Sequence, residues 1–167
     1  MLYATPDSPP FVVHWTEDVL AELLHHLRKS HPDWAGSRIT TIRDQLAGTF
    51  EGGRVDQYVI DATYLGADVG DAHVHAAAMA CNADVLVTFN VKDFVWDENV
   101  SSYEVMHPDD FLVLADDSFP DLIQEVTERM CSHWLERQEE ANLPAKLRTA
   151  GCPRFADRVR THLHRLM

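Results

Sequence analysis

The segment from residue 70 to residue 94 constrains the fold most, because a helical pattern passes directly into a strand pattern. It reads GDAHVHAAAMACNADVLVTFNVKDF. Small and apolar residues recur in it at helical spacing and predict the buried face of a helix: Val74, Ala77, Ala78 and Cys81. The run DVLVTF at 84–89 is short and β-branched, which favours a strand buried on both faces. This order predicts an α/β fold, in which ligands bind beyond the carboxyl ends of the strands.

Shorter patterns predict the other elements. A strand is expected at Phe11–Trp15, followed by a helix from Glu17 to about Lys29 with Thr16 as its N-cap. A second helix is expected from Ser37 to about Gly48. Further short strands are expected at Tyr58–Ile60 and Tyr103–Met106, and later helices near Pro108, from Pro120 to about Glu140, and at Pro144 and Pro153.

The length and composition of the chain limit the class of protein to which it can belong. A chain of 167 residues with 46% hydrophobic residues suits one domain with a helical appendage. We expect no membrane span, because no apolar run approaches ~20 residues. The start of the chain lacks the basic and apolar regions of a signal peptide. Three well-separated cysteines, with no CxxC pair, favour a reduced, cytoplasmic location.

Charge is unevenly distributed along the chain. The formal net charge is −13, which argues against a surface that coats nucleic acid. Residues 143–167 nevertheless carry six of the 14 basic residues and one of the 27 acidic residues. This basic tail is compatible with RNA binding. It is equally compatible with ion pairs between its basic residues and the acidic residues of the same chain.

Several motifs resemble one known family. The pattern DAxVxAAA followed by ADVLVTFNxKDF, at 71–94, is similar to the second half of a PIN domain, the nuclease fold of VapC-type bacterial toxins. WTEDVLAEL at 15–23 resembles the strand and helix of that family that carry an internal glutamate. HPDDFL at 107–112 and GCPRFADRVR at 151–160 resemble the C-terminal part of one subgroup. Together these motifs cover residues 11–160.

The resemblance implies a fold and an activity. It implies an α/β, PIN-like parallel sheet flanked by helices over residues 11–115, with residues 116–167 forming a helical extension packed on it. The implied activity is that of a metal-dependent endoribonuclease, the toxin of a type II toxin–antitoxin system, which hydrolyses RNA phosphodiester bonds.

The resemblance also selects site residues. Glu22, Asp71 and Asp93 correspond to the family's metal-binding and catalytic acids, and Asp68 adds a fourth metal-binding acid. Thr88 and Asn90 correspond to polar catalytic positions that support the site. The implied cofactor is Mg²⁺ or Mn²⁺, which lowers the pKa of an attacking water and is held by hard oxygen ligands.

Each of these residues has a structural alternative. Glu22 lies away from the centre of the apolar stripe of its helix and suits an exposed surface. Asp68 or Asp71 suits a helix cap, Asp93 suits an ordinary loop, and Asn90 suits a turn after a strand. His73 and His75 form an HxH pair, but positions i and i+2 on a helix face different ways, which argues against a zinc site there.

The start of the family pattern is missing. A PIN domain begins with a central strand that ends in a metal-binding aspartate and is followed by a helix; no such segment precedes Phe11. Either a partner chain or antitoxin supplies this strand, or Met1–Thr5 fills the gap, or the chain is a piece of a longer one. We favour the partner, and a homodimer is a further expected assembly. The alternative function is a catalytically inactive PIN-like subunit that acts in assembly of a toxin–antitoxin complex.

Overall fold

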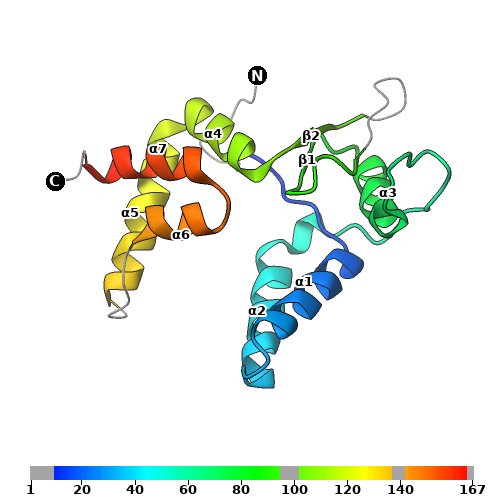
Figure 1. Ribbon diagram of the computed structural model, residues 1–167, viewed down its shortest axis with the longest axis horizontal. Coiled ribbons are helices and arrows are strands. Elements are labelled where there is room, and N and C mark those ends of the chain that lie inside the picture. The colour runs from blue at the N-terminus through cyan, green and yellow to red at the C-terminus, as the bar shows by residue number, and fades with distance from the viewer. Residues whose placement is uncertain (1–9, 95–101, 137–141, 165–167) are drawn as a thin grey trace. The chain divides into compact units, whose positions relative to one another are not determined.

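The structure is a computed structural model that describes residues 10–94, 102–136 and 142–164. These residues form seven α-helices and two short strands, coloured along the chain in Figure 1. The helices are α1 (Glu17–Ser30), α2 (Gly36–Thr49), α3 (Ala72–Ala80), α4 (Pro108–Ser118), α5 (Pro120–Glu136), α6 (Leu143–Thr149) and α7 (Pro153–His164). Two 3₁₀ turns, η1 (Glu51–Gly53) and η2 (Val69–Asp71), complete the regular structure of the described residues.

The predicted α/β fold is wrong. Among the described residues, the strands β1 (Val85–Val87) and β2 (Glu104–Met106) form a two-stranded parallel sheet, and the rest of the regular structure is helical. This is not a PIN-like parallel sheet flanked by helices. A β-branched run becomes a strand only where another strand accepts its backbone hydrogen bonds. Phe11–Trp15 has only a bridge from Trp15 to Arg54, and Tyr58–Ile60 has no ladder.

The predicted strand at 84–89 exists but is not buried on both faces. Val85 and Leu86 are half-buried, and Val87 is 41% exposed. The helix before it is buried around much of its circumference, with His73 and His75 inside together with four alanines. Periodicity therefore located α3 correctly, and Ala77 and Ala78 are buried as predicted, but burial extends to further faces of the helix because small residues allow close packing on several sides. The expected contribution of Met1–Thr5 lies outside the described residues.

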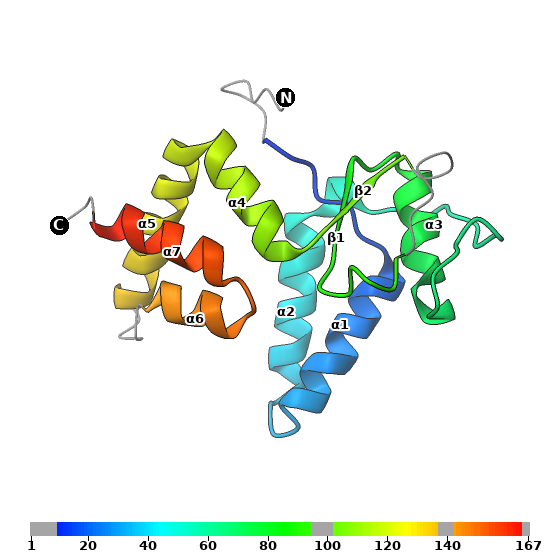
Figure 2. The same cartoon turned by 45° about the horizontal axis from the view of Figure 1, so that its top comes forward.

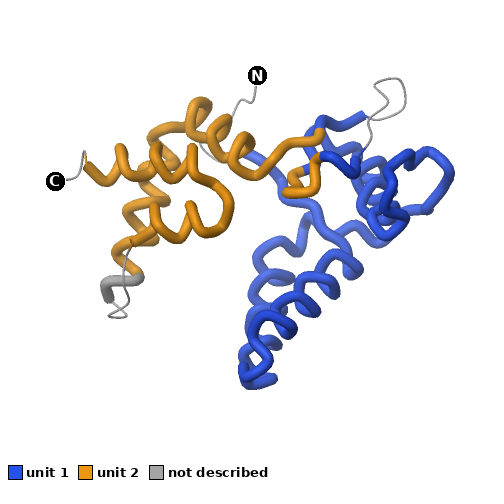
Figure 3. The backbone as a smooth tube through the Cα atoms, in the orientation of Figure 1, with its two compact units in different colours: residues 1–86, 92–104 blue, residues 87–91, 105–167 orange. Residues whose placement is uncertain are grey.

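The chain divides into two compact units, drawn in different colours in Figure 3. Unit 1 comprises residues 1–86 and 92–104, and unit 2 comprises residues 87–91 and 105–167. In unit 1, α1 and α2 pack side by side, as Figure 1 and Figure 2 both show. Thr16 caps α1 as predicted, since its hydroxyl accepts a hydrogen bond of 3.1 Å from the backbone N–H of Val19.

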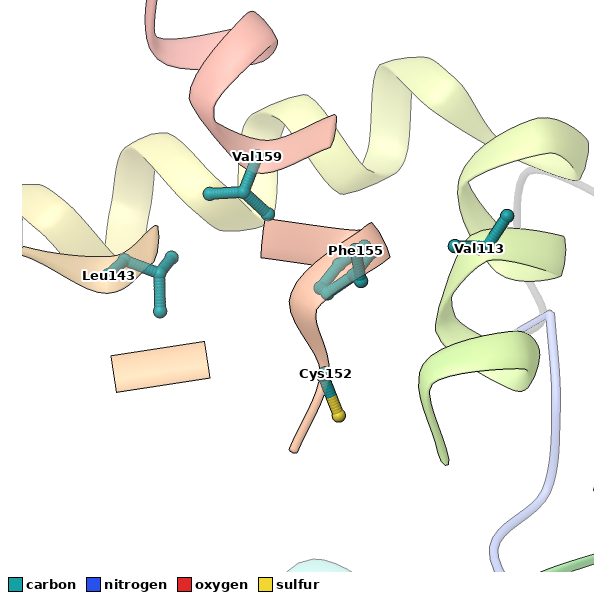
Figure 4. Close-up of a cluster of buried hydrophobic side chains, with 5 residues drawn as sticks. All are labelled: Val113, Leu143, Cys152, Phe155 and Val159. Atoms are coloured by element: carbon teal, nitrogen blue, oxygen red, sulfur yellow. The ribbon is translucent and has the colours of Figure 1, made fainter. Parts of the chain in front are cut away.

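Unit 2 has a helical core built from α4, α5, α6 and α7. Its buried members are labelled in Figure 4: Val113, Leu143, Cys152, Phe155 and Val159. The buried carboxylate of Asp109 on α4 caps α7, because its oxygens accept the backbone N–H groups of Arg154 at 3.1 Å and Phe155 at 2.8 Å. Asp116 of α4 pairs with His162 of α7 at 2.6 Å, and both side chains are buried. These polar contacts fix the register of α7 against α4.

Among the described residues, no helix combines the length and the apolar character needed to cross a bilayer.

Candidate functional site

The turn before α3 presents two of the predicted acids. Asp68 is the N-cap of η2, and its carboxylate accepts a hydrogen bond of 2.8 Å from the backbone N–H of Gly70. Asp71 closes η2 and occupies the N-cap position of α3, but its side chain makes no capping hydrogen bond there. The capping alternative therefore describes Asp68, and the carboxylate of Asp71 does not cap α3.

Four predicted acids from three segments of the chain converge in unit 1. Burial, and then the negative charges of Asp68, Glu22 and Asp93, raise the pKa of Asp71 above its ordinary value. Like charges disfavour the ionised form of a carboxyl group only when they are close to it. Glu22 comes from α1, where its side chain is 57% exposed, and Asp93 follows β1. We call Glu22, Asp68, Asp71 and Asp93 the acidic cluster.

Thr88 and Asn90 do not belong to this unit. Both lie in the 87–91 segment of unit 2. The hydroxyl of Thr88 accepts a hydrogen bond of 3.1 Å from the backbone N–H of Asn90, so it stabilises the local turn after β1. Asn90 is exposed. Their observed contacts are those of turn residues, as the structural alternative for Asn90 anticipates.

His73 is a site residue that the sequence reasoning set aside. Its Nδ1 lies 2.7 Å from the carbonyl oxygen of Gly70, and its Nε2 lies 3.8 Å from Oε1 of Glu22. The charge of His73 partly offsets the acids and lowers the pKa of Asp71. The HxH pattern directed attention to a His73–His75 pair, but the relevant neighbour of His73 is an acid on another helix. Sequence spacing carries no signal for that contact.

Tyr64 and Gly66 also border the acidic cluster and were not predicted. Burial, and then the charges of Asp71, Asp68 and Asp93, raise the pKa of Tyr64. The Tyr64 hydroxyl donates a hydrogen bond of 3.3 Å to the backbone carbonyl of Asp93. A Cβ at position 66 would collide with the Tyr64 hydroxyl and with the same carbonyl, so glycine is required for this close approach. Tyr64 and Gly66 therefore position the loop that carries Asp93.

His75 belongs to a separate series of hydrogen bonds that runs from Asp61 through Thr63 to Tyr103. Thr63 donates its hydroxyl proton to Asp61 at 2.5 Å, so its oxygen accepts a proton from Nε2 of His75 at 3.0 Å. Nδ1 of His75 then accepts the hydroxyl proton of Tyr103 at 2.5 Å. Both ring nitrogens of His75 therefore have partners, so its buried side chain and that of Tyr103 are held by a satisfied set of hydrogen bonds that reaches the exposed Thr63 and Asp61.

Tyr103 gives a testable pH dependence. Burial, and then the charge of Tyr64, raise the pKa of Tyr103 from 10.0 to about 12. Between these two pH values the folded chain keeps the phenol proton and the unfolded chain loses it, so stability falls as pH rises from 10.0 toward 12. We expect the free energy of unfolding, measured by urea titration, to fall over this range. In the Tyr103→Phe variant the fall should be smaller and the last tyrosinate absorbance step should be absent; an unchanged step would refute the assignment.

The donor set of the acidic cluster suits a divalent cation in its chemistry. Carboxylate oxygens are the ligands that Mg²⁺ and Mn²⁺ take in proteins. Burial, and then the neighbouring negative charges, raise the pKa of Asp71, and a bound cation would offset the charge contribution. Within residues 10–94, 102–136 and 142–164, however, no three His, Cys, Asp or Glu side chains are arranged to hold one ion together. The cluster therefore offers charge and ligands without a closed ligand shell.

The basic tail is largely neutralised by acids of its own unit. Arg148 and Arg160 pair with Asp157, Arg154 pairs with Asp110, and Arg158 pairs with Asp116 and Asp117. For these arginines the structure therefore favours ion pairs within the chain over RNA binding. Arg165 lies outside the described residues.

Comparisons with known proteins assign no family. No family model, no curated protein and no solved structure matches the chain. The case for a function therefore depends on the chemistry of the acidic cluster and on the residues around it.

Proposed function

We propose that the acidic cluster binds a divalent metal ion, Mg²⁺ or Mn²⁺, and that the chain is a metal-dependent endoribonuclease, the toxin of a toxin–antitoxin pair. The observation that carries the proposal is that the charges of three acids, Glu22, Asp68 and Asp93, act on Asp71. The resemblance to PIN-family positions selected Glu22, Asp71 and Asp93 from separate segments, and Asp68 was added as a fourth acid from the loop before Asp71. RNA is the substrate that this resemblance implies.

The roles of the chain's own residues follow from this arrangement. Glu22, Asp71 and Asp93 would hold the ion once a partner or a side-chain movement brings them together, and Asp68 holds the turn that presents Asp71. Tyr64 fixes the loop of Asp93 through its backbone carbonyl. A bound divalent ion supplies Lewis acidity toward a phosphodiester and lowers the pKa of water.

A partner chain that completes the site remains part of the proposal. Apolar side chains of unit 1 are exposed in the segments that the sequence predicts as strands, including Val12 and Ile60. Extended apolar segments of this kind can accept an added strand from another chain. An antitoxin or small protein that carries an apolar strand and an aspartate fits this requirement.

One observation favours a second function. Because no three potential ligands among the described residues share one ion position, the chain also suits a catalytically inactive subunit for assembly of a toxin–antitoxin complex. In that role the exposed apolar segments bind the partner, and the acids have no catalytic part.

Metal removal tests the first proposal. We expect the purified chain, alone or coexpressed with the products of neighbouring genes, to cleave single-stranded RNA. Cleavage should stop when EDTA is added and return when excess Mn²⁺ is restored. Cleavage that continues unchanged in EDTA would refute the metal site. A stable complex that never cleaves RNA would establish the assembly function instead.

A further inference from the structure

The end of the α1–α2 hairpin, where a short loop joins the two helices, is rich in basic residues (Figure 2). Residues 25–43 contain four Lys or Arg residues and three histidines but one acidic residue, in a chain with 27 acidic and 14 basic residues. Arg28, Lys29 and Arg38 are exposed, and no acid of the described part of the chain forms an ion pair with them. This end of unit 1 is therefore positive, in contrast to the chain as a whole.

Helix stability accounts for only part of this pattern. Arg28 and Lys29 lie in the last turn of α1, where the helix dipole favours positive charge. Arg38 lies in the first turn of α2, where the dipole disfavours it, and that turn has neither an acidic residue nor a side-chain cap. A residue placed against the local preference of its helix indicates a role other than helix stability.

Arg38 belongs to a stack of planar groups built on Trp34. The guanidinium carbon of Arg38 lies 3.8 Å from the centre of the Trp34 ring. The ring of His31 is nearly parallel to that of Trp34, with an angle of 3° between the planes and 3.9 Å between the centroids. Arg28 fixes the loop from the other helix, because its guanidinium donates a hydrogen bond of 2.6 Å to the carbonyl oxygen of Trp34. The stack is therefore formed before any ligand arrives.

We infer that this surface, which we call the basic tip and define as Arg28, Lys29, His31, Trp34 and Arg38, binds single-stranded RNA. Unpaired bases stack on aromatic rings and on arginine guanidinium planes, and basic side chains neutralise the phosphates. One face of the Arg38 guanidinium lies on Trp34, and because Arg38 is exposed, a base can stack on its other face. Arg28 and Lys29 contact the phosphates. The choice of RNA rests on the proposed function, to which the basic tip adds a place of contact.

A separate positive surface meets a need of the proposed function. The acidic cluster repels the phosphates of RNA, and ion pairs within unit 2 neutralise arginines of the basic tail. Glu22 of the acidic cluster and Arg28 of the basic tip lie on the same helix, α1, about 9 Å apart along its axis. An RNA strand that binds the basic tip is thus held close to the acids.

Substitutions of Arg38 separate its charge from its planar shape. Arg38→Gln removes both, whereas Arg38→Lys keeps the charge and removes only the guanidinium plane. Lys29→Gln removes a charge outside the stack. Arg43→Gln is the matched control, because Arg43 is an exposed arginine of the same helix whose charge is already paired with Asp44 at 2.6 Å.

RNA binding by the full chain in EDTA measures the basic tip without the metal and without metal-dependent cleavage. The probe is a fluorescein-labelled single-stranded RNA followed by fluorescence anisotropy over a range of salt concentrations. We expect Arg38→Gln to weaken binding by roughly tenfold and Arg38→Lys by roughly fivefold, the latter with an unchanged salt dependence. Lys29→Gln should lower the slope of log affinity against log salt by about 0.7. Arg43→Gln should bind within about twofold of the wild type.

A measurement on the wild type guards against a variant that fails to fold. Added RNA should shift the indole N–H resonance of Trp34 in NMR spectra before that of Trp15, whose indole N–H is bonded to the carbonyl of Phe50 at 2.8 Å. Equal shifts of both indoles, equal RNA affinity of wild type and a folded Arg38→Gln, or no RNA binding would overturn the inference. A labelled poly-glutamate peptide that binds more tightly than the RNA would overturn it in favour of an acidic protein partner.

The same titrations distinguish failure of the inference from failure of the proposed function. RNA binding that depends on Arg38, in a chain that never cleaves RNA, would uphold the basic tip and refute only the nuclease proposal. Metal-dependent cleavage by a chain whose RNA binding is unchanged in Arg38→Gln would refute the basic tip alone.

Discussion

The Asp71→Asn variant is expected to cleave RNA at least about a hundredfold more slowly than the wild type, while keeping its fold. Asparagine has nearly the same shape as aspartate but lacks the negative charge that holds a cation. Asp71 is the acid on which the charges of Asp68, Glu22 and Asp93 converge, so its loss should affect metal binding more than the loss of an isolated surface acid. Initial cleavage rates at saturating Mn²⁺ and saturating RNA are the measurement.

Two controls make the Asp71→Asn result specific. Asp33→Asn makes the same chemical change at an exposed turn between α1 and α2, so its cleavage rate should equal that of the wild type. Circular dichroism should show an unfolding midpoint for Asp71→Asn no lower than that of the wild type, because the substitution removes repulsion between like charges. Wild-type cleavage rates in Asp71→Asn would show that the acidic cluster is not the active site.

The Asp109→Ala variant is expected to lower the free energy of unfolding of unit 2 by about 2–4 kcal/mol. The carboxylate of Asp109 is buried and accepts two backbone N–H groups at the start of α7. Alanine leaves both donors without this partner in a place that water reaches poorly. Urea titration of the full chain, followed by circular dichroism, measures the change.

The neighbouring acid provides the matched control for Asp109→Ala. Asp110 is exposed and pairs with Arg154, so Asp110→Ala should change the free energy of unfolding by less than about 1 kcal/mol. Hydrogen exchange gives a local readout, because the amide protons of Arg154 and Phe155 should exchange faster in Asp109→Ala. Equal stability of the two variants would mean that Asp109 does not stabilise α7.

Local signals in the sequence located the helices well. Thr16 predicted the start of α1, Pro108 predicted the start of α4, and Pro153 predicted the start of α7. Capping and proline preferences act within one turn of a helix, so a few adjacent residues suffice to read them. The short strands β1 and β2 were also predicted near their observed bounds.

Features that depend on distant partners were not predictable in the same way. The run at Phe11–Trp15 has strand-forming residues, yet its pairing with other strands is decided elsewhere in the chain. Asp109 lies at the start of its own helix, α4, but it caps α7, which lies more than 40 residues later. The arginines of the tail find their acids in the same manner.

The acidic cluster was predictable from the sequence only in part. Resemblance to family motifs selected Glu22, Asp71 and Asp93, and unit 1 brings their charges together. The same reasoning placed Thr88 and Asn90 with them, but these residues belong to unit 2. It also missed His73, because the contact between His73 and Glu22 joins two helices whose packing no local pattern encodes.

The interleaving of the two units has a consequence for the order of folding. The helices of unit 2 come from one continuous segment, residues 108–164, but Asp109 and Asp116 of α4 bind residues of α7, at the far end of that segment. Unit 1 needs residues 92–104 to return to residues far earlier, as in the contact between Tyr103 and His75. During synthesis, unit 1 must therefore wait for residues 92–104, whereas unit 2 must wait for α7, the last helix to be made.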